Sequence, residues 1–497
     1  MSEPILSYRD DDNFAASSPW KALTGIAVFI VVYLATSSLD HKQRAVAATF
    51  AAAVVLWISE AIPLAVTAML STVALVVTGA MSSKDAFGAY GDQIILLFIG
   101  SFILAKSMEE SGLDRRLALW LLSKPWATRT GSATLLSVGV IACGISLFVS
   151  NTATTAMLLP IVITLLKSMG KMQVGAPFSN GFLLMLTWGS SIAVGTIIGT
   201  PPNVVGVGMI AEATGERINF LTWAAFGMPI TIVMLVFAWL MLRPKAEDRA
   251  DNPDAVRLYA EEERAKLGKI RSAERSTIIA FAVAIFLWLL PGTIEYAYGT
   301  GSEVAKLWSA RMPEAVAALL GAAVLFLLPC SDTPARRAMT WRTATKIEWG
   351  TILLFAGGLA LGKAAFDSGL GRIVGESVSQ GLGASDVWAI TALATVLGIL
   401  ISELASNTAA ANVMVPVAIS IAQGADVNPI PPALGAIIGS NLGFMLPIST
   451  PPNAIINSTG LVPGKVMMRK GLIFDIAGFL ATMACLRILL PPLGLAD

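Results

Sequence analysis

Two short polar motifs each occur twice in this chain, inside long apolar segments. Ser-Asn-Thr occupies residues 150–152 and 406–408, and Thr-Pro-Pro-Asn occupies residues 200–203 and 450–453. Polar and helix-breaking residues are costly in a membrane-spanning helix, so their repetition indicates a functional role. Paired interruptions of apolar segments in the two halves of a chain are typical of the substrate site of a secondary transporter.

The Ser-Asn-Thr motif can present hydrogen-bonding groups at a helix end. These residue types are preferred N-caps, so we expect them to cap a helix that begins at Thr152 and another at Thr408. Free backbone N–H groups and the positive end of the helix dipole then form an anion site. The carbonyls that end the preceding arm suit a small hard cation. Ser146 and Ser402, four residues before each motif serine, can add a further oxygen.

The Thr-Pro-Pro-Asn motif predicts a break within an otherwise continuous span, because proline removes a donor and clashes with the preceding turn. Thr200 and Thr450 can cap the second half of the helix, with Pro201 and Pro451 at its first position. Carbonyl oxygens would come from the residues just before the two breaks, Gly199 and Ser449. We expect the two tips and the two breaks to converge on one site in the middle of the membrane.

The composition is that of a polytopic membrane protein. Hydrophobic residues make up 55% of the 497 and charged residues 13%, and the mean hydropathy is +0.72. Soluble domains carry about 25% charged residues. A net charge of +1 argues against nucleic-acid binding, and a single histidine, His41, argues against a histidine metal site. The polar residues 1–19 exclude a cleavable signal peptide, and no cofactor is expected.

Apolar runs long enough to cross a bilayer predict eleven spans. They occupy 20–38, 44–61, 62–80, 91–110, 180–212, 222–242, 276–292, 313–330, 349–367, 431–462 and 470–491. Two further apolar blocks, 132–166 and 385–422, are split by the Ser-Asn-Thr motif into halves that look too short to cross. We interpret these blocks as re-entrant hairpins with the motif at the tip.

Basic residues orient this topology. With the N-terminus inside, the inner segments hold 24 of the 34 lysines and arginines, nine of them in 243–275. An excess of positive charge on the cytoplasmic side is the usual pattern. It predicts a multi-pass protein of the plasma (inner) membrane, with a cytoplasmic N-terminus and an external C-terminus. The mixed charges of 243–275 predict a solvated linker helix between the two halves.

The repeat extends beyond the motifs. Leu97-Phe98-Ile99-Gly100 parallels Leu354-Phe355-Ala356-Gly357 at an offset of 257 residues, against 256 at Ser-Asn-Thr and 250 at Thr-Pro-Pro-Asn. Each unit has five predicted crossings, and an odd number places the second unit upside down, the arrangement that underlies alternating access. The predicted fold is therefore all-α, with two inverted repeats. Its predicted parts are a tail and first span (1–43), a first repeat (44–242), a linker (243–275), a second repeat (276–491) and a C-terminal tail (492–497). Within the first repeat they are a scaffold (44–110), a hairpin (132–168) and a broken span (180–212), and within the second a scaffold (276–348), a hairpin (385–422) and a broken span (431–462).

Charged side chains are missing from the segments that carry the motifs. No Lys, Arg, His, Asp or Glu occurs in 131–166, 178–211 or 427–464, so dipoles, hydroxyls and co-bound cations would meet an anion. Glu403, inside the second hairpin, is the exception, with a structural hydrogen-bond role and direct cation coupling as the alternatives. Glu60, at the end of a span, is expected to be structural.

Together these motifs, with Ser-Glu-Ala-Ile-Pro at 59–63, resemble the divalent anion:sodium symporters, the INDY-like dicarboxylate transporters. The resemblance extends from about residue 20 to 491. It implies a homodimer in the lipid bilayer, with a scaffold and a transport domain that moves as an elevator. It implies sodium-coupled uptake of C4 dicarboxylates such as succinate, fumarate and malate. Both motifs read Ser-Asn-Thr in full, as in dicarboxylate rather than sulfate members.

The resemblance also implies the site residues. The sodium ligands would be Ser146, Ser150, Asn151, Gly199, Ser402, Ala405, Asn407 and Ser449. The substrate would meet Ser150, Asn151, Thr152, Thr200, Pro201, Ser406, Asn407, Thr408, Thr450 and Pro451. Three alternatives stay open: a sodium-independent exchanger, a sulfate or oxyanion symporter, and an intramembrane enzyme or channel. The enzyme alternative lacks a metal cluster or a nucleophile–base pair, and a channel does not explain the duplicated broken helices.

Overall fold

The computed structural model describes residues 19–244, 254–299, 302–330, 336–382 and 386–496. These residues are helical, and their β-structure is a single isolated bridge between Pro329 and Arg337. Helices satisfy their own backbone hydrogen bonds, as a bilayer requires, so the predicted all-α class is confirmed. Parts of several predicted segments lie outside the described residues: the tail before 19, the linker at 245–253, the scaffold at 300–301 and 331–335, the hairpin residue 385 and the C-terminal residue 497.

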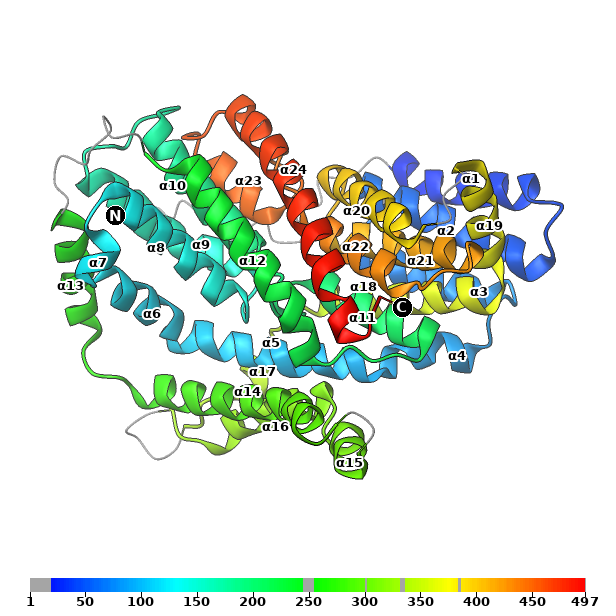
Figure 1. The fold of residues 1–497 in the computed structure, drawn as a ribbon, viewed down its shortest axis with the longest axis horizontal. Helices are drawn as coiled ribbons and strands as arrows, with labels where there is room; N and C mark the ends of the chain where they lie inside the picture. Colours follow the sequence, from blue (N-terminus) through cyan, green and yellow to red (C-terminus); the bar gives the residue numbers. More distant parts are fainter. Residues whose placement is uncertain (1–18, 245–253, 300–301, 331–335, 383–385, 497) are drawn as a thin grey trace.

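The chain forms two series of helices in similar order (Figure 1). The first series comprises α1 (Pro19–Ala35), α2 (His41–Ser59), α3 (Leu64–Val77), α4 (Ser83–Gly88), α5 (Gln93–Ser111), α6 (Leu113–Leu122), α7 (Pro125–Thr128), α8 (Gly131–Ser146), α9 (Asn151–Ser168), α10 (Pro177–Ser191), α11 (Pro201–Thr214) and α12 (Phe220–Leu242). After α13 (Asp254–Leu267), the second comprises α14 (Ser272–Tyr298), α15 (Glu303–Arg311), α16 (Glu314–Leu327), α17 (Trp341–Ala344), α18 (Trp349–Asp367), α19 (Leu370–Leu382), α20 (Val387–Leu404), α21 (Asn407–Gly424), α22 (Ile430–Asn441), α23 (Pro451–Ser458) and α24 (Gly464–Leu489). Short 3-10 turns occupy Ala89–Gly91, Ile197–Gly199 and Pro491–Leu493.

Fewer helices than predicted are long and apolar enough to cross a membrane alone. Among the described residues six qualify, or seven if α15 and α16, which meet at 53°, form one bent span. Five of these six helices are predicted spans, and α16 of the bent pair is the predicted span 313–330. The remaining five predicted spans fall short for local reasons: α1 and α3 have 17 and 14 residues, α2 begins with charged residues, and two spans are broken. Conversely α20, with 18 residues, qualifies. The expectation that each hairpin arm is too short to cross is therefore wrong for α20.

The two series pack against each other through matched close contacts. α5 lies against α16, where a Cβ on Gly100 would come within 2.7 Å of the Ala318 backbone. α18 lies against α3, where a Cβ on Gly357 would come within 2.6 Å of the Ala68 carbonyl oxygen. The two glycines stand 257 residues apart and the two alanines 250, which are offsets of the sequence repeat. Each series thus supplies the partner of the other's central helix.

A glycine corner follows each of these central helices. Gly112 ends α5 and Gly369 follows α18, both with φ of 71°, a conformation that glycine adopts without strain. Arg271, the N-cap of α14, donates to the carbonyl just before Gly112. Gln43, in the first turn of α2, donates to the carbonyl just before Gly369 at 3.1 Å. The two corners are therefore held in the same way, each by the opposite series.

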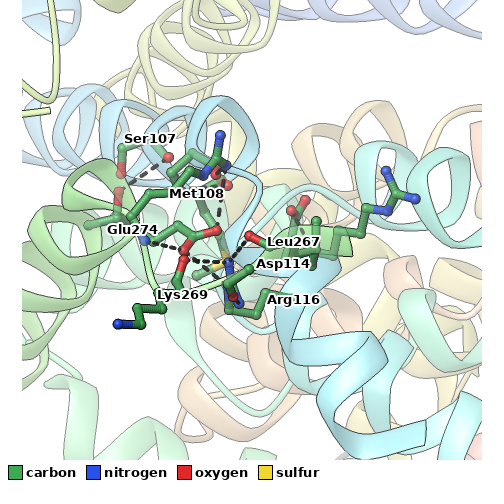
Figure 2. A network of polar contacts seen from close by, with 12 residues as sticks. Ser107, Met108, Asp114, Arg116, Leu267, Lys269 and Glu274 are labelled. Carbon is green, nitrogen blue, oxygen red and sulfur yellow. Dashed lines mark hydrogen bonds and ion pairs between the residues drawn. The ribbon is translucent and has the colours of Figure 1, made fainter. Parts of the chain in front are cut away.

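The linker between the series is fastened to α6. Arg116 forms an ion pair with the fully buried Glu274 (Nε–Oε2 3.0 Å), and Figure 2 shows the surrounding network. The same guanidinium donates to three linker carbonyls, those of Leu267, Gly268 and Lys269. Burial raises the pKa of the nearby Asp114 to about 6. The predicted linker helix exists as α13, but Val256 and Ala260 are buried, so one of its faces is packed rather than solvated.

Candidate functional site

The first Ser-Asn-Thr motif stands where α8 ends and α9 begins. Ser150 has an extended conformation (φ −60°, ψ 141°), and its hydroxyl accepts from the Ala153 N–H at 3.2 Å, which makes it the N-cap of α9. In the second motif Ser406 accepts from the Ala409 N–H at the same distance of 3.2 Å. The caps are thus the serines, and the helices begin at the asparagines, one residue before the expected Thr152 and Thr408.

Below each cap, a buried serine pairs with the motif asparagine. Ser146 Oγ donates to Asn151 Oδ1 at 2.7 Å, and Ser402 Oγ donates to Asn407 Oδ1 at 2.7 Å. Both serine side chains are completely buried, whereas both asparagines are half-buried. Each pair gathers neutral oxygens across a break in the helix, where carbonyls also lack helical partners. Such sets of oxygen ligands suit a small hard cation.

The oxygens around the second pair form a cradle. A Cβ on Gly443 would lie 3.1 Å from Ser402 Oγ, 3.3 Å from Asn407 Oδ1 and 3.4 Å from the Ser402 carbonyl oxygen. Glycine therefore keeps open a space that is bordered by three oxygens. The neighbouring Ala405 is extended (φ −137°, ψ 173°) at the end of α20, so its carbonyl also lies outside the helix. The space fits an ion that takes oxygen ligands.

The first break offers a comparable set of oxygens. A Cβ on Gly199 would lie 2.2 Å from the Ala193 carbonyl oxygen and 3.0 Å from Thr196 Oγ1. Gly199 ends a 3-10 turn just before α11, so its own carbonyl is at a helix end. Ser449, its expected counterpart, is different. Its hydroxyl donates to the carbonyls of Gly443 and Leu446, both at 2.8 Å, and so braces the loop.

Both Thr-Pro-Pro-Asn motifs begin a helix after a break, as predicted. Thr200 and Thr450 are the N-caps of α11 and α23, and the prolines Pro201 and Pro451 open the two helices. The Thr450 hydroxyl accepts from the Asn453 N–H at 3.2 Å. The Thr200 hydroxyl is buried and has no hydrogen-bond partner among the described residues. One of the two caps is therefore free to take a ligand.

A continuous chain of hydrogen bonds joins the two hairpin tips through the first break. Thr196 Oγ1 donates to the Leu147 carbonyl at the first tip (2.6 Å), and Asn203 Nδ2 donates to the Thr196 carbonyl (2.9 Å). Asn441 Nδ2 then donates to Asn203 Oδ1 (2.9 Å). Asn407 Nδ2 closes the chain at the second tip by donating to the Asn441 carbonyl (3.4 Å). The tips and breaks thus form one connected polar centre within the apolar core.

The second break is tied to the first series by another bond. Thr187 Oγ1 on α10 donates to Asn453 Oδ1 on α23 at 2.8 Å. Sequence reasoning found Asn203 and Asn453 as parts of their motif but assigned them no role, and it missed Thr187, Thr196 and Asn441. Asn441 could have been noticed, since it is an amide in the uncharged segment 427–464. Thr187 and Thr196 carry no signal, because isolated threonines are common in membrane helices.

Several groups of the motifs lie on the accessible side of the tips. Thr152 and Thr408 are half-buried, and neither hydroxyl has a hydrogen-bond partner among the described residues. Pro201 is half-buried and Pro451 is exposed, whereas Ser146 and Ser402 lie beneath them in the interior. Two surface pockets lie elsewhere, one beside Lys42 and Asp367 and one beside Gln93 and Glu314.

Comparison with known proteins places this architecture. Residues 16–495 match the family model described as the sodium:sulfate symporter transmembrane region. The chain is 31% identical over 450 residues to the sodium-dependent dicarboxylate transporter SdcS of Staphylococcus saprophyticus. The aligned region covers 88% of this chain and 84% of the relative. It is 32% identical over 428 residues to SdcS of Staphylococcus aureus strain NCTC 8325, and this aligned region covers 84% of this chain and 80% of the relative.

A solved structure shares the fold. The YdaH transporter of Alcanivorax borkumensis, described as having an unusual topology, superposes with a TM-score of 0.54 and 13% identity. The match covers 82% of this chain and 86% of YdaH. These matches identify a membrane transporter rather than an enzyme, and they confirm the resemblance drawn from the motifs. The chain belongs to the sodium:sulfate symporter family, that of the divalent anion:sodium symporters.

Proposed function

We propose that this protein is a sodium-coupled symporter that imports C4 dicarboxylates such as succinate, fumarate and malate. The observation that carries the proposal is the pair of Ser–Asn contacts, each 2.7 Å long, at two capped and hydrogen-bonded hairpin tips. Two cation sites made of neutral oxygens, next to two helix N-termini, suit an anion with two carboxylates that enters with sodium. The family and the names of the two relatives support the same assignment.

In this proposal the first sodium ion meets Ser146, Ser150, Asn151 and Gly199, and the second meets Ser402, Ala405 and Asn407. Gly443 leaves the space for the second ion, and Ser449 acts by bracing the loop that contains Gly443. The carboxylates meet the half-buried tips, through the residues Ser150, Asn151, Thr152, Thr200, Pro201, Ser406, Asn407, Thr408, Thr450 and Pro451. Sodium binds first and neutralises the carbonyl ends, and the site then attracts the dianion.

The transport step is an elevator movement of the hairpins, the broken spans and the last span of each repeat. The scaffold, 44–80 and 276–330, stays fixed and forms the contact of a homodimer. The exposed apolar residues of α3, among them Met69, Leu70 and Val73, support such a contact. The matched glycine corners support the movement, because they stand where the central helices turn toward the hairpins. The N-terminus lies in the cytoplasm and the C-terminus outside the inner membrane.

Succinate uptake into proteoliposomes tests the coupling. An inward sodium gradient should drive accumulation of labelled succinate, and choline in place of sodium should remove it, because neutral oxygen sites without a bound cation leave the anion uncompensated. Uptake that proceeds equally in choline and needs internal dicarboxylate would instead identify an exchanger.

The same assay separates the substrate classes. Unlabelled succinate should compete well and sulfate poorly, because two separated helix N-termini suit two carboxylates better than one compact anion. Sulfate that competes as strongly as succinate would identify an oxyanion symporter, and the proposed dicarboxylate selectivity would then be wrong.

Cysteine labelling tests the movement. A cysteine placed next to Thr152 should react with a membrane-impermeant reagent from the cytoplasm in one state. A cysteine next to Thr408 should react from outside in the other state, and sodium with succinate should change both rates. Labelling of both tips from the same side under every condition would contradict the inverted topology and the elevator.

A further inference from the structure

Two acidic side chains lie together in the interior, next to the second hairpin tip. Glu403, near the end of α20, and Asp475, in the middle of α24, are 5% and 4% exposed. The Glu403 carboxylate accepts from the N–H groups of Met445 at 2.7 Å and Leu446 at 2.8 Å. Neither oxygen of Asp475 has a hydrogen-bond partner of ordinary geometry. The polar groups that Asp475 faces are the Glu403 carboxyl and the Phe444 N–H.

The charge of this carboxyl pair, Glu403 and Asp475, is not balanced by the protein. None of the ion pairs among the described residues includes either carboxyl. The side chains of Phe444 and Phe474 are fully buried beside it, with ring centroids 4.6 Å apart, so the surroundings are apolar. Buried carboxylates in contact repel each other and lose their hydration, and both costs fall when a cation lies between them. Glu403 accepts two N–H hydrogen bonds, so the carboxyl that lacks more stabilisation for its negative charge is Asp475.

In the first series, the corresponding contact between the last span and the loop of the break contains no charged side chains. A Cβ on Gly227 would meet Val194 and Gly195, and a Cβ on Gly471 would meet their counterparts 250 residues later, Phe444 and Met445. The match of Gly227 with Gly471 places Thr231 at the position of Asp475, and the Ser-Asn-Thr offset of 256 places Leu147 at the position of Glu403. Thr231 Oγ1 donates to the Ile192 carbonyl at 3.0 Å, and the Leu147 carbonyl accepts from Thr196. Neutral, satisfied groups thus build this junction, so the fold does not require the carboxyl pair.

We propose that Glu403 and Asp475 hold a monovalent cation, a third sodium site that is distinct from the two Ser–Asn pairs. This inference rests on the proposed sodium-coupled transport. The unpartnered Asp475 oxygens and the second lone pairs of the Glu403 oxygens supply the ligands. Glu403 follows Ser402 directly, so an ion here joins α24 to the hairpin tip and stabilises the arrangement that binds the second sodium.

The number of sodium ions coupled to each succinate measures this site. In proteoliposomes, the sodium gradient that just balances a fixed succinate gradient gives the coupling number without depending on the transport rate. Asp475→Asn should lower this number by one relative to wild type, because the amide no longer offers an anionic ligand. The purified variant should also show a smaller rise in melting temperature with sodium in the absence of succinate. Thr231→Val, the matching change in the first series, should leave both values unchanged.

Four outcomes overturn or redirect the proposal. An unchanged coupling number in well-folded Asp475→Asn overturns it, and so does a variant that alters proton coupling alone, since the pair then holds a proton. If Asp475→Asn does not fold, Glu403→Gln is read by the same two measurements. If the wild type shows no sodium-driven uptake at all, the proposed symport fails first. The melting temperature of the purified wild type with and without sodium, compared with that of Asp475→Asn, still reports whether the carboxyl pair binds the ion.

Discussion

Replacing Gly443 with alanine is expected to weaken the sodium affinity of coupled uptake by about one to two decades. The new methyl group would lie 3.1 Å from Ser402 Oγ and 3.3 Å from Asn407 Oδ1, inside the oxygen cradle. These oxygens belong to buried or half-buried groups that are already hydrogen-bonded, so they cannot withdraw without breaking the Ser–Asn pair. Loss of a single bond to a charged group costs about 1.5–3 kcal/mol, or about one to two decades in affinity. Sodium titration of succinate uptake measures the effect.

Gly144→Ala is the matched control. Gly144 lies on α8 in the other hairpin, and a Cβ there meets no atom within 4 Å. Alanine should fit, and in a helix interior it stabilises by roughly 0.5–1 kcal/mol relative to glycine. We therefore expect normal uptake and a slightly higher melting temperature. If Gly443→Ala keeps the sodium affinity of the wild type and Gly144→Ala is also normal, the second ion does not bind in the space beside Gly443.

The caps and the breaks could be predicted from sequence because local chemistry determines them. The proline pairs at 201–202 and 451–452 each open a helix after a break, and Ser406 caps its helix through the N–H of Ala409, three residues away. The glycine corners at Gly112 and Gly369 are local in the same sense, since each glycine stands in a Ser-Gly-Leu segment, at 111–113 and 368–370. The first helical residue was misplaced by one position because Ser and Thr compete for the same cap.

The bonds that join the site could not be predicted, because they depend on how the two halves pack. Asn441 reaches Asn203 across 238 positions of the chain, and no local pattern gives that register. The number of spans was overestimated for a related reason. Hydropathy detects that α2 and α3 are apolar, but their ends are fixed by Asp40 and Pro63, which leave α3 only 14 residues.

The carboxyl pair shows both what local sequence can predict and what depends on packing. Glu403 is conspicuous as a charge in the middle of the second hairpin, and its alternatives, a hydrogen-bond role and cation coupling, stay open from the sequence. The bonds that Glu403 accepts from the N–H groups of Met445 and Leu446 account for the hydrogen-bond role. Only the packing of α24, at Gly471, against the loop at Phe444 and Met445 brings Asp475 to it. A single carboxylate in a sequence is ambiguous, whereas two that share one apolar enclosure need either a bound cation or a shared proton.

Asn407→Ala and Asn151→Ala are expected to weaken both sodium and succinate binding, but with different effects on stability. Each change removes the hydrogen-bond acceptor of a buried serine. Loss of one bond to a charged ligand costs about 1.5–3 kcal/mol, so we expect the affinity to fall by about one to two decades. Asn407 also donates to the Asn441 carbonyl, so its loss opens the chain between the tips. The first tip keeps its separate link from Thr196 to Leu147. Asn407→Ala should therefore have the lower melting temperature.

Binding of labelled succinate to the purified variants, with and without sodium, checks the affinities, and thermal unfolding checks the stabilities. Asn180→Ala provides the comparison, because Asn180 is buried more deeply than the half-buried tip asparagines and donates to the Gly175 carbonyl at the far end of α10. It should lose stability and keep its affinity. If Asn180→Ala weakens succinate binding as much as Asn151→Ala does, the losses at the tips reflect general destabilisation. If only the tip variants lose affinity and sodium no longer enhances what remains, ion and anion share these two asparagines.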